Sequence, residues 1–203
     1  VEQQYRCWNK AILPALVEQQ IVLLKESDFD KAQRKIVDEF FRQRAFPILT
    51  PMAIDPSHPS PRFHNRGLYL AALLQRTSGL GPAELFAVVQ LPQVLPRFID
   101  VGGPQENKFV LLEDIIACKL SELFGGYESA HQATFRLTRD MDVDMLEQES
   151  DDMLRAIEAR LRARPHSAPE RLEVHQETRR ARLAPRIGER GAVPDGGGVK
   201  LND

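Results

Sequence analysis

Apolar residues in the first 45 positions of the chain recur at the spacing of an α-helix. One apolar face runs through the first 24 residues, and its members are Tyr5, Trp8, Ile12 and Leu16. Because residues three or four positions apart share one side of a helix, this pattern predicts a helix, which Pro14 is expected to kink.

A second helix is predicted to end before Pro47. Ser27 is a suitable N-cap for it, because the acidic residue Asp30 follows three positions later, as in a capping box. The residues of this helix that are expected to face inward are Phe29, Ala32, Ile36, Val37 and Phe40. The two segments together predict a helical pair at the start of the chain.

The pattern changes at Phe46, where short apolar runs separated by turn residues replace the helical spacing. Such runs predict strands, which are expected at residues 46–54, 67–74, 85–91, 134–138 and 171–175. Segments 97–99 and 108–111 are expected to form a hairpin across a Gly-Gly-Pro turn. Helical spacing returns at 113–124, and again in a long helix that Asp144 would cap and Pro165 would end.

Strands and helices therefore mix without the strict alternation of a parallel α/β fold. The predicted fold class is α+β, with a mixed, largely antiparallel sheet and packed helices, preceded by the N-terminal helical pair. We expect one folded domain over residues 46–176, with residues 1–45 before it and 177–203 after it.

The composition is that of an ordinary soluble globular protein, with 42% apolar residues, 28% charged residues and a net charge of −2. No apolar run reaches the roughly 20 residues that span a bilayer, so no transmembrane segment is expected. Cys7 and Cys118 show neither metal-ligand spacing nor a disulfide pattern, which favours a cytoplasmic location. The chain does not begin with Met, and we expect it to be a fragment or a processed piece.

No sequence motif identifies a catalytic residue, a cofactor-binding residue or a metal ligand. The chain lacks a GxxxxGK[ST] phosphate loop, a GxGxxG turn after a strand, a GxSxG elbow and an HExxH pair. His58 and His64 share a proline-rich loop with Asp55, for which a structural hydrogen-bonding role is preferred and a weak metal or phosphate site is the alternative.

Arginine is concentrated in residues 153–190, which contain ten arginines and five acidic residues, a net charge of +5. Such a segment attracts polyanions, since arginine binds phosphate oxygens in bidentate fashion. The residues predicted to bind a polyanion are Arg160, Arg164, Arg179, Arg180 and Arg182. The preferred interpretation of the segment is nevertheless a solvated helix face with ion pairs such as Glu158–Arg162. Nucleic acid is not an expected partner, because stacking aromatic residues are missing from this segment and the total charge is near neutral.

The segment FPILTPMAIDPSHP at 46–59 resembles the start of the middle (head) domain of bacterial polyphosphate kinases of the first type. Further segments resemble the same family in the same order, and they lie at 86–92, 95–99, 109–116, 123–127, 135–140 and 171–174. Ser60 departs from the family pattern, and the resemblance ends after His175. It implies that residues 1–45 end an N-terminal helical domain, that 46–176 are the head domain, and that 177–203 are a divergent tail or the start of the next segment.

The resemblance implies an enzyme that transfers the terminal phosphate of ATP onto polyphosphate, through a phosphorylated histidine and with magnesium. In this family the histidine and most phosphate- and metal-binding residues lie in two C-terminal domains, so the chain alone is expected to be inactive. The resemblance also implies that the head domain forms a homodimer and contributes to the substrate tunnel. Apolar residues such as Phe63 and Phe98 would support the dimer. The alternative is a non-catalytic polyanion-binding or assembly module, the product of a truncated gene.

Overall fold

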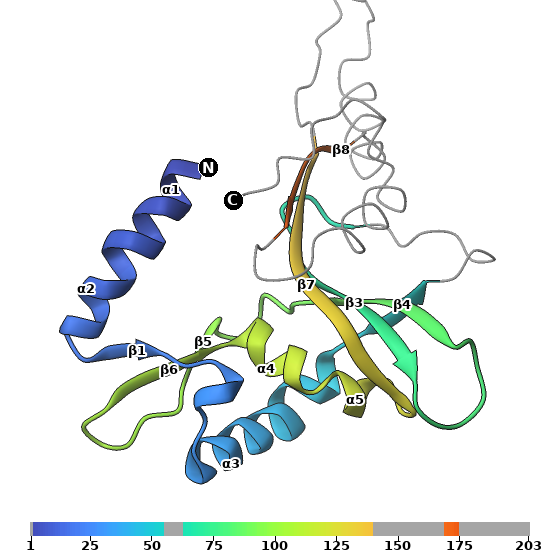
Figure 1. Cartoon of the computed structure of the whole chain (residues 1–203), viewed down its shortest axis with the longest axis horizontal. Coiled ribbons are helices and arrows are strands. Elements are labelled where there is room, and N and C mark those ends of the chain that lie inside the picture. The colour runs from blue at the N-terminus through green and yellow to red at the C-terminus, as the bar shows by residue number, and fades with distance from the viewer. Residues whose placement is uncertain (1, 55–62, 140–168, 175–203) are drawn as a thin grey trace, which may run out of the picture.

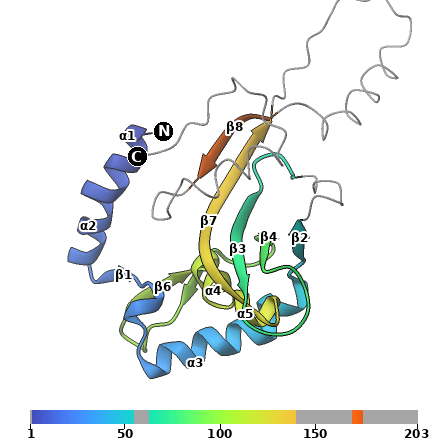
Figure 2. The same ribbon diagram turned by 45° about the vertical axis from the view of Figure 1, so that its right-hand side comes forward.

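The larger of two sheets has five antiparallel strands and organises the fold (Figure 1). This computed structural model describes residues 2–54, 63–139 and 169–174. In the order in which they pair, the strands are β2 (Pro51–Ile54), β4 (Glu84–Gln90), β3 (Leu68–Arg76), β7 (Tyr127–Arg139) and β8 (Pro169–Val174). Figure 2 shows these strands side by side, with β8 and β2 at the two edges.

The two central strands are buried on both faces, which accounts for their continuous apolar sequences. In β3, Leu70, Ala72 and Leu74 belong to one hydrophobic cluster, whereas Tyr69 and Leu73 belong to a second cluster on the opposite face. The strands predicted at 67–74 and 85–91 are therefore confirmed, and so is the α+β class.

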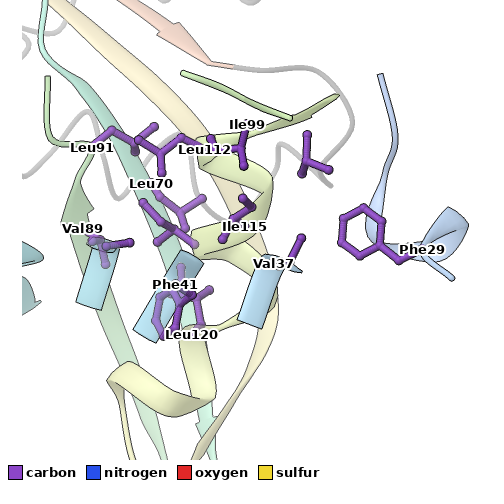
Figure 3. Packing of buried hydrophobic residues seen from close by; sticks show 14 of the residues in the cluster. Phe29, Val37, Phe41, Leu70, Val89, Leu91, Ile99, Leu112, Ile115 and Leu120 are labelled. Carbon is purple, nitrogen blue, oxygen red and sulfur yellow. The ribbon is translucent and has the colours of Figure 1, made fainter. Parts of the chain in front are cut away.

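The first hydrophobic cluster fills the space between the sheet and the helices (Figure 3). Val37 and Phe41 come from the region of α3, Ile115 and Leu120 from α4 and α5, and Leu70 from β3. The helices involved are α3 (Lys31–Phe40), α4 (Leu112–Cys118) and α5 (Leu120–Leu123). The last two correspond to the helix predicted at 113–124, with a break between them at Lys119.

Three aromatic rings stabilise the second cluster, and they belong to Phe63, Tyr69 and Phe135. The ring of Phe63 packs edge-on against Tyr69 and Phe135, with centroid distances of 5.0 and 5.3 Å, and the other two rings are stacked at 5.4 Å. Phe63 is only 3% exposed. The prediction that Phe63 supports a dimer interface is therefore wrong, because these ring contacts already bury its side chain.

The smaller sheet consists of β1 (Ile21–Leu23), β6 (Asn107–Leu111) and β5 (Phe98–Asp100). Strands β5 and β6 form the predicted antiparallel hairpin. Strand β1 pairs in parallel with β6 and lies where the sequence predicted a helix. The helix ends before Gln20, whose φ is 60°, and the β-branched residues Ile21 and Val22 favour an extended backbone.

A helical arm at the start of the chain stands apart from the larger sheet in both views (Figures 1 and 2). It consists of α1 (Glu2–Cys7), the π-helical turn η1 (Trp8–Ile12) and α2 (Leu13–Glu18). Pro14 lies in the first turn of α2, so the predicted interruption takes the form of the π-helical turn that precedes it. Among the described residues, no helix has the length and apolar character needed to cross a membrane.

The N-cap of α3 is Asp30 rather than Ser27. The Oδ1 atom of Asp30 accepts a hydrogen bond from the Gln33 backbone N–H at 2.8 Å, and the Gln33 Oε1 atom accepts one from the Asp30 N–H at 3.0 Å. Ser27 instead lies in the 3-10 turn η2 (Glu26–Asp28) and donates to Asp28. The capping prediction was wrong because Asp30 and Gln33 have the same capping-box spacing as Ser27 and Asp30.

The later start of α3 also changes which of its side chains face inward. Gln33 and Val37 are the buried residues of α3, whereas Ala32 and Ile36, predicted to face inward, are exposed. Phe29 is buried as predicted, although it precedes the helix.

The strand predicted from Phe46 begins only at Pro51. Residues Phe46–Ile48 form the 3-10 helix η4, which continues the π-helical turn η3 (Phe41–Ala45). Pro47 does not prevent this, because a residue in the first turn of a helix needs no N–H donor. The strand predicted at 134–138 is part of the much longer β7, and the long helix predicted between residues 144 and 165 lies outside the described residues.

An ion pair connects Arg97, the residue before β5, to α4. Glu113, in the first turn of α4, has only 7% of its side chain exposed. The Nε atom of Arg97 donates to its Oε1 and Oε2 atoms at 3.0 and 3.3 Å, and Nη2 donates to Oε1. The pair provides the counter-charge that a buried carboxylate requires.

Replacing Asp30 with Ala is expected to lower the free energy of unfolding by about 1 kcal/mol, because α3 loses the acceptor at its N-terminus. Ser27→Ala is the matched control, and its effect should stay within about 0.5 kcal/mol, since Ser27 does not cap the helix. Urea denaturation of both variants measures the difference. An equal or larger loss in Ser27→Ala would contradict this assignment of the N-cap.

Replacing Arg97 with Ala is expected to lower the free energy of unfolding by about 2–3 kcal/mol, because the buried Glu113 carboxylate loses its counter-charge. In the Arg97→Ala, Glu113→Gln double variant the loss should be smaller than the sum of the two single losses, because the unpaired charge is gone. A double-mutant cycle in urea measures this coupling. Strictly additive losses would show that the two side chains are energetically independent.

Candidate functional site

Most residues that the sequence singled out as binding residues lie outside the part of the chain that the structure describes. This holds for the predicted polyanion-binding residues Arg160, Arg164, Arg179, Arg180 and Arg182. It also holds for Asp55 and His58, whereas His64 is exposed and its backbone N–H donates to the Tyr69 hydroxyl at 2.8 Å. The basic segment is therefore represented in the structure by Arg171 of β8.

Strands β7 and β8 present a polar face opposite the aromatic cluster. Arg136 pairs with Glu173 in the register of the two strands, and Thr138 pairs with Arg171. Residues that alternate with these four belong to the second hydrophobic cluster, and they are Phe135, Leu137, Leu172 and Val174. Because successive side chains of a strand point to opposite faces, the four polar side chains share one face of the sheet. We call these four residues the β7–β8 polar face.

Two guanidinium nitrogens on the β7–β8 polar face lack a hydrogen-bond acceptor in the described part of the chain. They are the Nε atoms of Arg136 and Arg171, and both are buried. The Nη2 atom of Arg171 donates to Glu173 Oε1 at 2.9 Å, so the ion pair leaves the Nε atom unsatisfied. Because an unsatisfied buried donor costs about 1–3 kcal/mol, movement of either side chain that lets its Nε atom reach water or an anion is expected to be favourable.

The charge of the β7–β8 polar face suits an anion. Two arginines are opposed by one carboxylate, that of Glu173, which leaves a net positive charge. The planar guanidinium group matches the spacing of phosphate and carboxylate oxygens, and a phosphate group has enough oxygens to contact two arginines. None of the four side chains is a nucleophile with an adjacent base, so the face is suited to binding rather than to bond formation.

A second candidate site is an open hollow of about 940 Å³ beside α4, α5 and the start of β7. Glu26, Cys118, Glu128 and His131 are among its lining residues. Burial raises the pKa of the Cys118 thiol to about 12, and the charge of Glu26 adds to the effect. The thiol therefore stays protonated and is a poor nucleophile. Within residues 2–54, 63–139 and 169–174, no three His, Cys, Asp or Glu side chains come together as a metal-binding group.

Lys119 beside this hollow has a structural role. Its Nζ atom lies 2.6 Å from Asp38 Oδ1 and 2.9 Å from Glu122 Oε1. Burial disfavours the ammonium charge, but the hydrogen bonds to Asp38 and Glu122 outweigh it and raise the pKa of Lys119 above its usual value. The charged lysine thus links α3 to the junction of α4 and α5. Because neither Cys118 nor Lys119 provides a reactive group at the hollow, the β7–β8 polar face is the better candidate for a binding site.

Sequence reasoning included Arg171 in the basic segment but missed Arg136. The two residues are distant in the sequence, and the pairing of β7 with β8 brings them to one face. The alternation of Phe135 and Leu137 with polar neighbours was a usable signal, because it predicts a strand with one buried and one polar face.

Sequence comparisons identify relatives of this chain. A family model, described as the polyphosphate kinase middle domain, matches residues 32–186. The polyphosphate kinase of Bacillus cereus is 38% identical over 177 residues, which cover 86% of this chain and 25% of that protein. The polyphosphate kinase of Aphanizomenon baltica is 36% identical over 188 residues, which cover 88% of this chain and 48% of that protein. The chain thus spans a quarter to a half of the length of these relatives.

A solved structure has the same fold. The crystal structure of polyphosphate kinase from Porphyromonas gingivalis matches 98% of this chain and 28% of its own, with a TM-score of 0.74 and 24% identity. Because the family model covers more than half of the sequence and includes every strand of the larger sheet, the chain belongs to the polyphosphate kinase family and contains its middle domain.

Proposed function

We propose that this chain is the middle part of a polyphosphate kinase that transfers the terminal phosphate of ATP onto a polyphosphate chain. The observation that carries this proposal is the match of residues 32–186 to the middle domain of that family. The chain corresponds to about a quarter of the Bacillus cereus relative, and the proposal assigns the phosphorylated histidine and the nucleotide site to C-terminal domains of the whole enzyme.

The described residues bring together no group of three His, Cys, Asp or Glu side chains that could hold a metal ion, and the proposal assigns no step of the phosphate transfer to them. The proposal gives this part of the enzyme a supporting role, in which it helps form the dimer and the tunnel through which polyphosphate passes. In that scheme magnesium and ATP bind elsewhere in the enzyme.

The proposal divides the chain into three parts. Residues 1–45 end an N-terminal helical domain, residues 46–176 form the head domain, and residues 177–203 are a divergent tail or the start of the next segment. The positively charged side chains that would attract polyphosphate through long-range electrostatics are Arg160, Arg164, Arg179, Arg180 and Arg182.

Dimer formation through the head domain is the second part of the proposal. Val94 and Phe98 are 82% and 51% exposed; Val94 lies in the loop between β4 and β5, and Phe98 is the first residue of β5. These two large apolar side chains, exposed four positions apart in the sequence, support the proposal that this segment contacts another protein. A second copy of the chain would remove both side chains from water.

The 203-residue chain alone is expected to produce no polyphosphate from ATP and magnesium, because the proposed catalytic residues belong to other domains. Polyphosphate formation can be measured with a chain-length-sensitive dye, and the Bacillus cereus enzyme is the positive control. Robust synthesis by the 203-residue chain would overturn this division of roles.

Exchange of the corresponding segment of the Bacillus cereus enzyme for this chain distinguishes the kinase proposal from a non-catalytic assembly module. A working middle domain should support polyphosphate synthesis in the chimaera, because the chain supplies the same fold at 38% identity. A folded chimaera of native size that makes no polyphosphate would favour the assembly module.

The chain is expected to sediment as a dimer at micromolar concentration, and Phe98→Glu should shift it towards the monomer because a charge would be buried at the interface. Leu80→Glu is the matched control, since Leu80 is 99% exposed at the turn between β3 and β4. Sedimentation velocity measures both variants. An equal shift in the two variants, or a wild-type chain that is monomeric, would contradict this interface.

A further inference from the structure

We propose that Arg136 and Arg171 of the β7–β8 polar face form a contact site for the phosphate oxygens of a polyphosphate chain. The site overlaps the basic segment at Arg171, and its second residue, Arg136, lies outside that segment. The inference rests on the proposed function for the identity of the ligand, and on the geometry of the polar face for the site itself.

The unsatisfied nitrogens define the positions of the missing acceptors. The Nε atoms of Arg136 and Arg171 are buried and have no acceptor within the described part of the chain. Their strands are direct neighbours, and the Arg136–Glu173 and Thr138–Arg171 pairs place the two arginines diagonally across one ladder. Diagonal neighbours on one face lie within reach of long side chains, so the oxygens of one phosphate chain can contact both guanidinium groups, and both nitrogens gain acceptors once the side chains turn towards the ligand.

Glu173 sets the orientation of Arg171. Its Oε1 atom accepts from Nη2 at 2.9 Å, and the Nε atom of the same guanidinium is left without an acceptor in the described part of the chain. A single carboxylate cannot neutralise two arginines, so the residual charge favours a ligand that carries several negative charges. The negative charge of Glu173 repels such a ligand weakly. Removing that charge should therefore strengthen binding, whereas removing either arginine should weaken it.

The backbone that carries the two arginines is rigid. The neighbouring residues Phe135, Leu137 and Leu172 are at most 1% exposed, and β7 is paired on both sides, with β3 and with β8. Because the strands are already fixed by this packing, binding orders only the two side chains. A preorganised site of this kind loses less entropy on binding than one on a loop.

The test is calorimetric titration of the 203-residue chain with inorganic tripolyphosphate at low salt. Arg136→Gln and Arg171→Gln are each expected to raise the Kd about tenfold or more, as expected for loss of a hydrogen bond to a charged ligand. Arg42→Gln is the matched control, because Arg42 is exposed, pairs with Glu122 and loses the same charge. Its Kd should change less than about threefold, consistent with loss of a distant, screened charge.

Glu173→Gln is expected to lower the Kd, which provides a gain of binding that an unfolded variant cannot imitate. Binding should weaken as salt rises, because counterions are released from the phosphate chain. Circular dichroism and thermal unfolding of each variant establish that it is folded. Wild-type Kd values in both folded Arg→Gln variants, or no effect of Glu173→Gln, would overturn the site.

ATP titrated in place of tripolyphosphate distinguishes the two sources of a triphosphate group. A phosphate-chain site should bind long polyphosphate more tightly than ATP, because the chain offers more charge and no base is recognised. Tighter binding of ATP than of tripolyphosphate would overturn the assignment to the chain. The polyphosphate assay of the chimaera is independent of these titrations. The assay can therefore contradict the proposed function while the titrations support the site, and the titrations can contradict the site while the assay supports the function.

Discussion

The pairing of β3 with β7 is the interaction on which the rest of the structure depends. It runs from the Leu68–Arg136 pair to the Arg76–Tyr127 pair, with one irregularity between Leu73 and Leu74. Because β3 is buried on both faces, it lies between the two hydrophobic clusters and contributes side chains to each of them. The helices cover one face, and the aromatic rings of Phe63, Tyr69 and Phe135 pack on the other.

Much of this fold could be predicted from apolar patterning, and the exceptions have local causes. The central strands and the β5–β6 hairpin were predictable because continuous apolar runs and glycine turns leave few alternatives. Strand β1 was missed because the apolar residues 21–23 follow the apolar residues of the helix after only three polar positions, and the pairing with β6 shows that they are extended. Phe46–Ile48 was mistaken for a strand because Pro47 suits both an extended segment and a first helical turn.

Of the two arginines of the candidate site, the sequence indicated Arg171 and missed Arg136. Arg171 belongs to a basic segment that composition alone reveals, but Arg136 lies outside that segment, in a strand of mixed apolar and polar residues. Its importance arises from long-range pairing, and a sequence read without knowledge of strand order contains no such information. The buried Nε atoms likewise follow from packing and not from residue type.

The strict alternation along β8 makes the polar face and the core inseparable. Arg171 and Glu173 face one way, whereas Leu172 and Val174 are buried on the other side. A shift of β8 by one residue relative to β7 would exchange these two sets, placing an arginine and a glutamate in the apolar cluster and exposing a leucine and a valine. The register that buries Leu172 and Val174 is therefore also the one that places Arg171 and Glu173 on the polar face, and a one-residue slip would disrupt both together.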